Sequence, residues 1–349
     1  MRNMFSKNLK YYRLRSSMTK KELAEKSDLT PMAISNYESG ARTPSMETLK
    51  KLAAALKVNV SDFLAVRNTN LVFAHGEFRK LSTLSESKQD YVRESVEEYF
   101  SRFYTAVELL GGEVLPDAPK CHSLPMIGNI EEDAKAMRQH LGIATEGPVN
   151  DLITTLENKG ILIYVFSIKN NKFSGMNGFV NIRPYIIVNG SMSPERNRST
   201  ISHELAHLMF AWPQDMSEQQ IETTATAIAG AFLFPLEDAV RELGIHRNSV
   251  TKDMTLVCQE YGISMYLLVK RAEIAGIISK DAAKSFYIIA NNLGWRTNEP
   301  SRIKPEKPIL FEQLVFRAVS EHEISIQRGA ELLQMPYDSV VSSCCFDKV

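Results

Sequence analysis

The sequence predicts a multidomain protein that is mainly α-helical and contains one α+β part. At 349 residues the chain is long enough for two or three domains, each with its own core. Most segments place apolar residues at helical spacing and are preceded by capping residues. Runs rich in β-branched and aromatic residues are confined to the middle of the chain, at 160–168 and 184–188. We expect four parts, at residues 1–66, 67–125, 126–280 and 281–349.

Composition and charge restrict the classes of protein that fit this chain. The sequence contains no run of 18 apolar residues, and its first residues lack the apolar core of a signal peptide, so we expect a cytoplasmic protein without a membrane partner. The four cysteines show no CxxC spacing and fit reduced thiols. Net charge is zero overall, yet residues 1–66 hold 12 Lys/Arg and 6 Asp/Glu, a charge of +6. This local excess indicates an anionic partner for the first 66 residues.

Residues 1–66 are predicted to form five short helices. The predicted helices are Phe5–Ser16, Lys20–Ser27, Pro31–Ser39, Met46–Leu56 and a short one after Ser61. Thr19 and Glu22 form a capping box at the second helix, and Thr30 caps the third, which stops at Gly40. Two short helices across a tight turn, within a basic five-helix unit, are typical of a helix-turn-helix (HTH) domain.

The same segment resembles the XRE family of phage-repressor-like DNA-binding domains. The resemblance rests on Met18-Thr-Lys-Lys-Glu-Leu-Ala, Ile34-Ser-Asn-Tyr-Glu-Ser-Gly40, Pro44-Ser, Leu52-Ala53 and Leu56. It implies that 31–38 is the recognition helix on double-stranded operator DNA, where a homodimer on paired half-sites is the usual geometry. The candidate DNA contacts are Lys20, Thr30, Met32, Ala33, Ser35 and Asn36. The alternative is a protein–protein or dimerisation module.

The connector, residues 67–125, is expected to be two irregular links around one long helix. The first link is polar and covers Arg67–His75, the helix covers Ser85–Leu110, and the second link covers Pro116–Pro125. Gly111 and Gly112 stop the helix. Its aromatic and apolar stripe predicts a packed core surface or a seam between domains, rather than a cofactor site.

Residues 126–280 combine helices with strands, and helices follow to the end of the chain. We expect helices at Glu131–Leu141 and Val149–Asn158, strands at Gly160–Ile168 and Pro184–Val188, and a hairpin or loop at Asn170–Asn181. A helix capped by Ser199 or Thr200 follows, then a helix Ile221–Phe234 and a tail of two or three helices at Leu310–Val341.

The helix near residue 203 carries the chemistry. His203 and His207 are four residues apart and share one helix face, where they can bind one Zn²⁺, while Glu204 can take a proton from the metal-bound water. The competing interpretation is two ordinary helix histidines and a surface glutamate. A catalytic zinc needs a third protein ligand, and Pro213 excludes a third histidine at the position six residues after His207.

Three carboxylates remain as third-ligand candidates: Asp215, Glu218 and Glu222. Glu222 is favoured because it lies on a helix with an apolar face, which holds geometry better than a loop.

The stretch Glu222-Thr-Thr-Ala225-Thr-Ala-Ile-Ala-Gly-Ala-Phe-Leu233-Phe-Pro235 is similar to the ImmA/IrrE metallopeptidase family, and later motifs follow the order of fused XRE–ImmA/IrrE proteins. The resemblance implies a zincin-like domain with an HExxH…E site, in which Glu222 is the third zinc ligand. One position departs, because Thr226 stands where the family has Asn or Asp. The metal is expected to be Zn²⁺, with Mn²⁺ or another divalent ion as alternatives.

The resemblance implies a DNA-binding zinc endopeptidase and transcriptional regulator that cleaves a transcriptional repressor. The alternatives are a DNA-binding or antitoxin-like regulator whose metal domain senses a ligand or metal without cleavage, and a structural zinc fold. An intact Glu204 argues against the structural site, which has no need for a base. Tyr185 and His246 are both candidates to stabilise an oxyanion, and the spacing does not choose between them.

Overall fold

The computed structural model describes residues 2–76, 84–170, 172–296, 298–300 and 303–344, and divides the chain into two compact units. The first comprises Met1–Phe73, Leu81–Val114 and Phe311–Val349, and the second comprises Ala74–Lys80 and Leu115–Leu310. The mainly α-helical architecture with a small mixed sheet confirms the predicted fold class. The domain limits at residues 66, 125 and 280 stay predictions.

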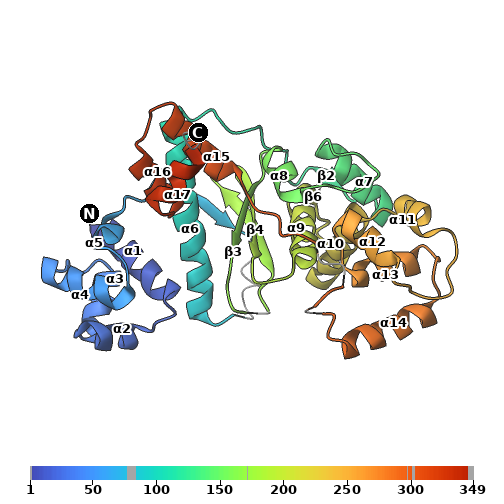
Figure 1. Cartoon of the computed structure of the whole chain (residues 1–349), viewed down its shortest axis with the longest axis horizontal. Helices are drawn as coiled ribbons and strands as arrows, with labels where there is room; N and C mark the ends of the chain where they lie inside the picture. Colours follow the sequence, from blue (N-terminus) through green and yellow to red (C-terminus); the bar gives the residue numbers. More distant parts are fainter. Residues whose placement is uncertain (1, 77–83, 171, 297, 301–302, 345–349) are drawn as a thin grey trace. The chain divides into compact units, whose positions relative to one another are not determined.

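The first unit begins with the five predicted helices (Figure 1). They are α1 (Arg2–Arg15), α2 (Lys20–Ser27), α3 (Pro31–Glu38), α4 (Met46–Leu56) and α5 (Val60–Leu64). The capping box is confirmed, since the Thr19 hydroxyl accepts from the Glu22 N–H at 3.1 Å and the Thr19 N–H donates to the Glu22 carboxylate at 2.7 Å. The last helix starts before Ser61, because Asp62 accepts the Asn59 N–H at 2.7 Å and fixes the first turn there.

The long helix α6 (Glu86–Leu109) is joined in this unit by α15 (Leu310–Ser320, from its second residue), α16 (Ile326–Leu333) and α17 (Tyr337–Cys344). The helix ends at Leu109, directly before the predicted stop at Gly111 and Gly112, whose φ angles are +90° and +86°. Residue 67 does not belong to a solvated linker. Its guanidinium is buried and donates to Asn8 at 2.7 Å and to Glu94 at 3.1 Å.

The second unit is built on a four-stranded sheet in the order β1-β4-β5-β3. Its strands are β1 (Phe73–His75, of which Ala74 and His75 belong to this unit), β3 (Leu162–Phe166), β4 (Gly175–Val180) and β5 (Arg183–Asn189). Strand β3 runs parallel to β5, and β4 runs antiparallel to β5 with Asn177 opposite Ile186 and Gly178 opposite Tyr185. The expected hairpin or loop at 170–181 therefore contains a strand.

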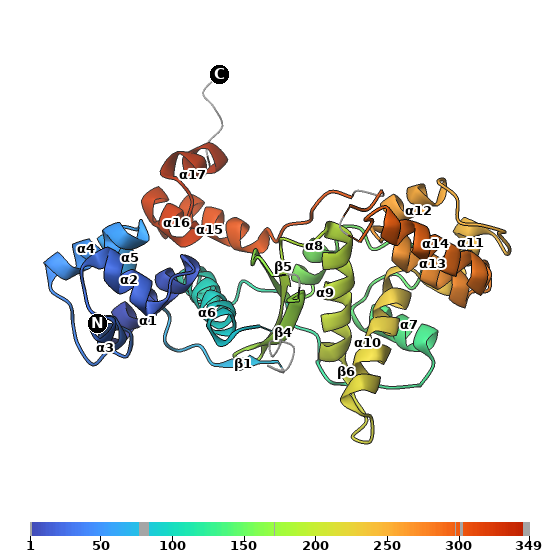
Figure 2. The same cartoon turned by 90° about the horizontal axis from the view of Figure 1, so that it is seen from below.

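Helices complete the second unit around one core (Figures 1 and 2). They are α7 (Ile130–His140), α8 (Leu152–Glu157), α9 (Pro194–Met209), α10 (Glu218–Leu233), α11 (Leu236–Leu243), α12 (Met254–Tyr261), α13 (Met265–Ile274) and α14 (Lys280–Asn292). A two-stranded parallel pair joins β2 (Leu124–Pro125) to β6 (Phe210–Ala211), so the second predicted link ends in a strand. Helix α9 packs against β4 and β5 on one side and against α10 on another.

An extended strap, residues 303–310, is bonded to this unit by three carboxylates. Glu157 accepts the N–H groups of Ile309 and Leu310 at 3.0 and 3.2 Å. Glu195 accepts the Ile303 N–H at 3.0 Å, and Glu306 of the strap accepts the Ile153 N–H at 3.1 Å. Burial raises the pKa of Glu157 to about 7, against an ordinary value of 4.5.

Candidate metal centre

Helix α9 begins earlier than the sequence suggested, and this start determines which residues face the core. Ser193 is the N-cap, its hydroxyl accepts the Arg196 N–H at 3.3 Å, and Pro194 occupies the first turn. Ser199 and Thr200 lie inside the helix, so the prediction that either one caps it is wrong.

The apolar residues of α9 orient its two histidines. The buried positions are Ile201, Leu205, Leu208 and Met209, all fully inaccessible to solvent. Because residues four apart share a helix face, His203 and His207 project together on a face that this packing leaves partly open. Their ring centroids are 4.8 Å apart.

Helix α10 brings a carboxylate to the same place. It starts at Glu218, where Ser217 and Gln220 form a capping box, so Glu222 lies in its second turn and does not open the helix. The face that packs in the core comprises Ala225, Ile228, Ala229, Phe232 and Leu233. Since α10 packs directly against α9, Glu222 faces the two histidines from a rigid element.

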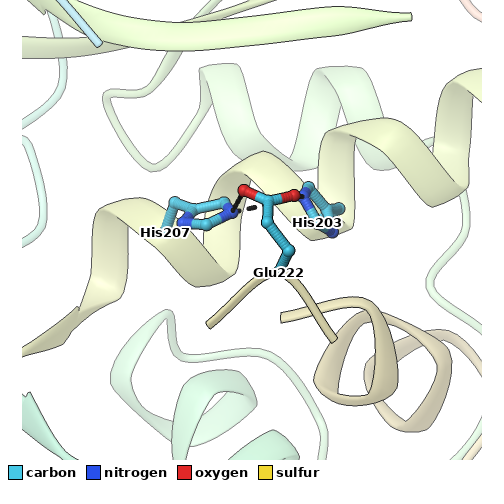
Figure 3. Close-up of side chains that lie close together, drawn as sticks. All are labelled: His203, His207 and Glu222. Carbon is cyan, nitrogen blue, oxygen red and sulfur yellow. Dashed lines mark hydrogen bonds and ion pairs between the residues drawn. The ribbon is translucent and has the colours of Figure 1, made fainter. Parts of the chain in front are cut away.

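The three side chains surround a common point (Figure 3). The His203 and His207 Nε2 atoms are 3.2 Å apart. One Glu222 oxygen lies 3.2 Å from the His203 Nε2, and the other lies 3.2 Å from the His207 Nε2. A tetrahedral zinc with bonds of about 2.05 Å separates its ligands by about 3.3 Å. The spacing and the nitrogen and oxygen donors therefore fit a divalent cation such as zinc.

Within the described residues, these are the His, Cys, Asp and Glu donors that come together in this way. Asp215 and Glu218 do not belong to this group. Asp215 lies in the turn before α10, and Glu218 is exposed on its first turn.

Glu204 lies beside His203 but points toward the sheet. Its residue is only 2% exposed, and its Oε2 accepts a hydrogen bond of 2.7 Å from the Asn177 side-chain amide on β4. This bond restricts the rotation of the Glu204 carboxylate next to the candidate metal ligands. Asn177 was missed from the sequence, because it lies 27 residues away in a segment expected to be a hairpin or loop.

Thr226 contacts His203, the first of the candidate ligands, from behind. Its hydroxyl donates to the Glu222 carbonyl oxygen at 2.8 Å and lies 3.2 Å from the His203 Nδ1. Because the single hydroxyl proton of Thr226 is donated to the Glu222 carbonyl, the Thr226 oxygen acts as an acceptor toward His203, whose Nδ1 then carries the proton. That tautomer leaves the Nε2 lone pair directed at the candidate metal position.

The predicted DNA-contacting residues lie on α2, α3 and the turn between them. Ile34 and Tyr37 bury one face of α3, and the opposite face carries Met32, which is 69% exposed. Lys20 at the start of α2 donates to the Ser35 hydroxyl at 3.2 Å, which places these two candidates side by side. The Thr30 hydroxyl accepts the Ala33 N–H at 3.1 Å, so it serves first as the cap of α3.

Comparison with known protein families agrees with the assignment of an HTH domain near the start of the chain and of a peptidase-like domain in its middle. Residues 9–63 match the family described as Helix-turn-helix, and residues 156–273 match a peptidase family described as IrrE N-terminal-like domain. The chain is an HTH domain fused to an ImmA/IrrE-type domain. No curated protein and no solved structure matches it.

The matched ranges enclose the candidate residues of both sites. The IrrE-like range covers His203, Glu204, His207 and Glu222 together with Asn177. The HTH range covers the six candidate DNA contacts, from Lys20 to Asn36. The chain is thus a DNA-binding regulator with a protease-like domain. None of the described helices is long and apolar enough to cross a bilayer.

The two candidates for oxyanion stabilisation lie elsewhere in the IrrE-like domain. Asn177 and its partner Ile186 face α9, so the adjacent Tyr185 projects from the other face of the sheet. There the Tyr185 hydroxyl bonds the His75 Nδ1 at 2.6 Å. His246 lies in the exposed loop after α11, where its Nε2 bonds Asn248 at 3.0 Å.

Proposed function

We propose that this protein is a zinc-dependent endopeptidase that binds operator DNA through its HTH domain and cleaves a transcriptional repressor. The observation that carries the peptidase part is the triangle of His203, His207 and Glu222 with Glu204 buried beside it. A site with a purely structural metal has no use for a carboxylate in that position. The match of residues 156–273 to a peptidase family supports the same reaction class.

The residues of the site would divide the work as follows. His203, His207 and Glu222 would hold the ion, and zinc when bound supplies Lewis-acid chemistry that acidifies water and polarises a peptide carbonyl. Glu204 takes the proton of the attacking water and delivers it to the leaving amine nitrogen. Asn177 keeps the Glu204 carboxylate in place during this transfer, and Thr226 keeps His203 in the tautomer that can bind a cation.

For the HTH domain, we propose that the exposed side of α3 enters the major groove. The candidates remain Lys20, Thr30, Met32, Ala33, Ser35 and Asn36, among which Lys20 suits a phosphate contact. The charge of +6 in the first 66 residues supports association with the DNA backbone. DNA binding would concentrate the peptidase near a repressor on the same operator.

The decisive variant is Glu204→Gln, which keeps the shape of the side chain and removes the base. We expect it to retain stoichiometric zinc by elemental analysis and to bind operator DNA as the wild type does. It should lose cleavage of its cognate repressor by at least a hundredfold, measured by gel electrophoresis and mass spectrometry. Glu218→Gln, an exposed carboxylate one turn from Glu222, is the matched control and should change nothing.

The ligand set is tested with the same assays. His203→Ala, His207→Ala and Glu222→Ala should each lose zinc, because each removes one of three protein ligands. If the wild type cleaves nothing with Zn²⁺ or Mn²⁺, the protein is a regulator whose metal domain senses a ligand or metal.

A further inference from the structure

One edge of the sheet in the IrrE-like domain is covered by residues 74–76 of the chain itself, here called the resident segment. The strand order places this segment against β4. The Gly76 N–H donates to the Asn177 carbonyl oxygen at 2.9 Å. A β-carbon on Gly76 would lie 2.6 Å from that oxygen, so only glycine allows the two backbones to approach this closely.

Asn177 connects this edge to the candidate base. Its carbonyl accepts from the resident segment, and its side-chain amide donates to Glu204. A strand paired with β4 therefore contacts Asn177, the residue that also hydrogen-bonds the candidate base Glu204. Without the resident segment, the outer N–H and C=O groups of β4 would be a template for another extended chain.

The resident segment is anchored from the far face of the sheet. The Tyr185 side chain crosses above Gly178, where a β-carbon would meet its hydroxyl at 2.5 Å, and reaches the His75 Nδ1 at 2.6 Å. This contact holds the segment without entering the metal centre.

Side chains alternate along a strand, so the residues on either side of His75 take the face that carries Asn177. These residues are Ala74 and Gly76, which place one methyl group and no side chain there. The resident segment thus supplies main-chain hydrogen bonds to β4 and almost no bulk beside Glu204.

We infer that the outer edge of β4 is the docking surface for an extended segment of the protein substrate, and that residues 74–76 occupy this edge until the substrate displaces them. The inference rests on the proposed peptidase function and deepens it. The fitting substrate is an unfolded or loop segment with small residues opposite Asn177, since that face admits Ala and Gly in the resident segment. While the resident segment is paired with β4, the substrate cannot pair with this edge, and the peptidase site is latent.

If the edge is open in only a fraction of the molecules, the apparent affinity for substrate is the intrinsic affinity multiplied by that fraction. Weakening the resident segment should therefore raise affinity without any new contact to the substrate. Two variants do this by different routes. Gly76→Ala introduces the clash with the Asn177 carbonyl, and His75→Ala removes the anchor on Tyr185.

The experiment measures binding separately from cleavage. Each variant is made in the zinc-loaded Glu204→Gln protein, and fluorescein-labelled β-casein is the probe, read by fluorescence anisotropy. We expect Gly76→Ala and His75→Ala each to tighten binding at least tenfold. Ile182→Ala, in the turn between β4 and β5 with a side chain 93% exposed, is the matched control and should leave the affinity unchanged.

Hydrogen–deuterium exchange of the free protein gives a second readout. The β4 amides should exchange faster in Gly76→Ala and His75→Ala than in the parent or in Ile182→Ala. Unchanged casein affinity in both variants, or unchanged exchange, overturns the inference. If Gly76→Ala unfolds the domain, His75→Ala carries the test, because it acts from the opposite face.

The outcomes separate this inference from the proposed function. Tighter casein binding in the Glu204→Gln background, combined with no cleavage by any chain that keeps Glu204, supports the docking edge and rejects the peptidase. Equal affinity and equal cleavage in wild type, Gly76→Ala and His75→Ala support the peptidase and reject the resident segment as an occupant of its substrate edge.

Discussion

The imidazole of His203 is constrained at both of its nitrogens. Its Nε2 lies 3.2 Å from a Glu222 oxygen, and its Nδ1 lies 3.2 Å from the Thr226 hydroxyl. An amide or carboxylate is usual at this position in the family that the sequence resembles. The Thr226 hydroxyl can accept a hydrogen bond from that Nδ1, because its own proton is committed to the Glu222 carbonyl.

Removing that hydroxyl should weaken zinc binding without removing a ligand. We expect Thr226→Val to lower zinc affinity by about 10- to 100-fold, measured by competition with a chelator, because His203 then loses the partner that fixes its tautomer. Thr226→Asn should restore the affinity. Thr223→Val is the matched control, since the Thr223 hydroxyl donates to the Gln219 carbonyl at 2.8 Å on the same helix without touching a ligand.

Residue spacing could predict much of the candidate site but not all of it. The spacing of His203 and His207 is local, and the helical repeat alone places them on one face. Glu222 followed from preferring a packed helix and from a resemblance, and the structure brings it to the two histidines. Asn177 could not be found this way, since its contact with Glu204 depends on how β4 pairs and which face meets α9.

At the scale of elements, the sequence before α9 contains two competing signals for the start of the helix. Ser199 and Thr200 stand just before the apolar run and resemble caps, while Ser193 is followed by Pro194 and Glu195, which suit a first helical turn. The earlier signal prevails, and it adds more than one turn before His203. The same difficulty affected β4, whose glycines suggested a loop although Gly178 is required for the passage of Tyr185.

The cap can be tested by comparing two serine variants of the same helix. Ser193→Ala should lower the free energy of unfolding by about 1 kcal/mol, because the Arg196 N–H loses its acceptor. Ser199→Ala should have no destabilising effect of that size, since Ser199 lies within the helix. Urea unfolding of the zinc-free proteins measures both, and equal losses would contradict the start of α9 at Pro194.

At the scale of the whole molecule, several helices were predictable and their grouping into two units was not. Capping boxes and apolar periodicity located the five HTH helices and the long α6 within a few residues, and they indicated two or three helices at Leu310–Val341 without their individual limits. The helices α11 to α14 were not predicted. The return of Phe311–Val349 to the first unit depends on contacts between distant segments. One of these contacts is the hydrogen bond of 2.9 Å from the Gln334 side-chain amide to the Glu98 carboxylate, which no local sequence pattern predicts.

The strap makes the stability of the fold depend on pH. The pKa of Glu157 is raised to about 7 by burial, so the folded state holds this proton more tightly than the unfolded state. The resulting stabilisation is fully present below pH 4.5 and is lost as the pH rises through 7. Between pH 5.5 and 8 the wild type should lose about 2 kcal/mol of unfolding free energy relative to Glu157→Gln.

This difference is read from urea unfolding of zinc-free protein at the two pH values. The glutamine keeps a carbonyl oxygen for the Ile309 and Leu310 N–H groups, so the variant should fold. Glu132→Gln, an exposed carboxylate on α7, should follow the wild-type pH dependence. A parallel pH dependence of wild type and Glu157→Gln would show that Glu157 titrates normally.

The division of the chain also sets an order of events during synthesis. The second unit, ending at Leu310, interrupts the first, whose final segment begins at Phe311. As the chain leaves the ribosome, α6 must therefore wait for α16 until the entire IrrE-like domain has emerged. A nascent chain stalled before residue 311 would already contain His203, His207 and Glu222, the candidate metal ligands, while the first unit still lacked its last helices. The IrrE-like domain can therefore fold before the first unit is complete.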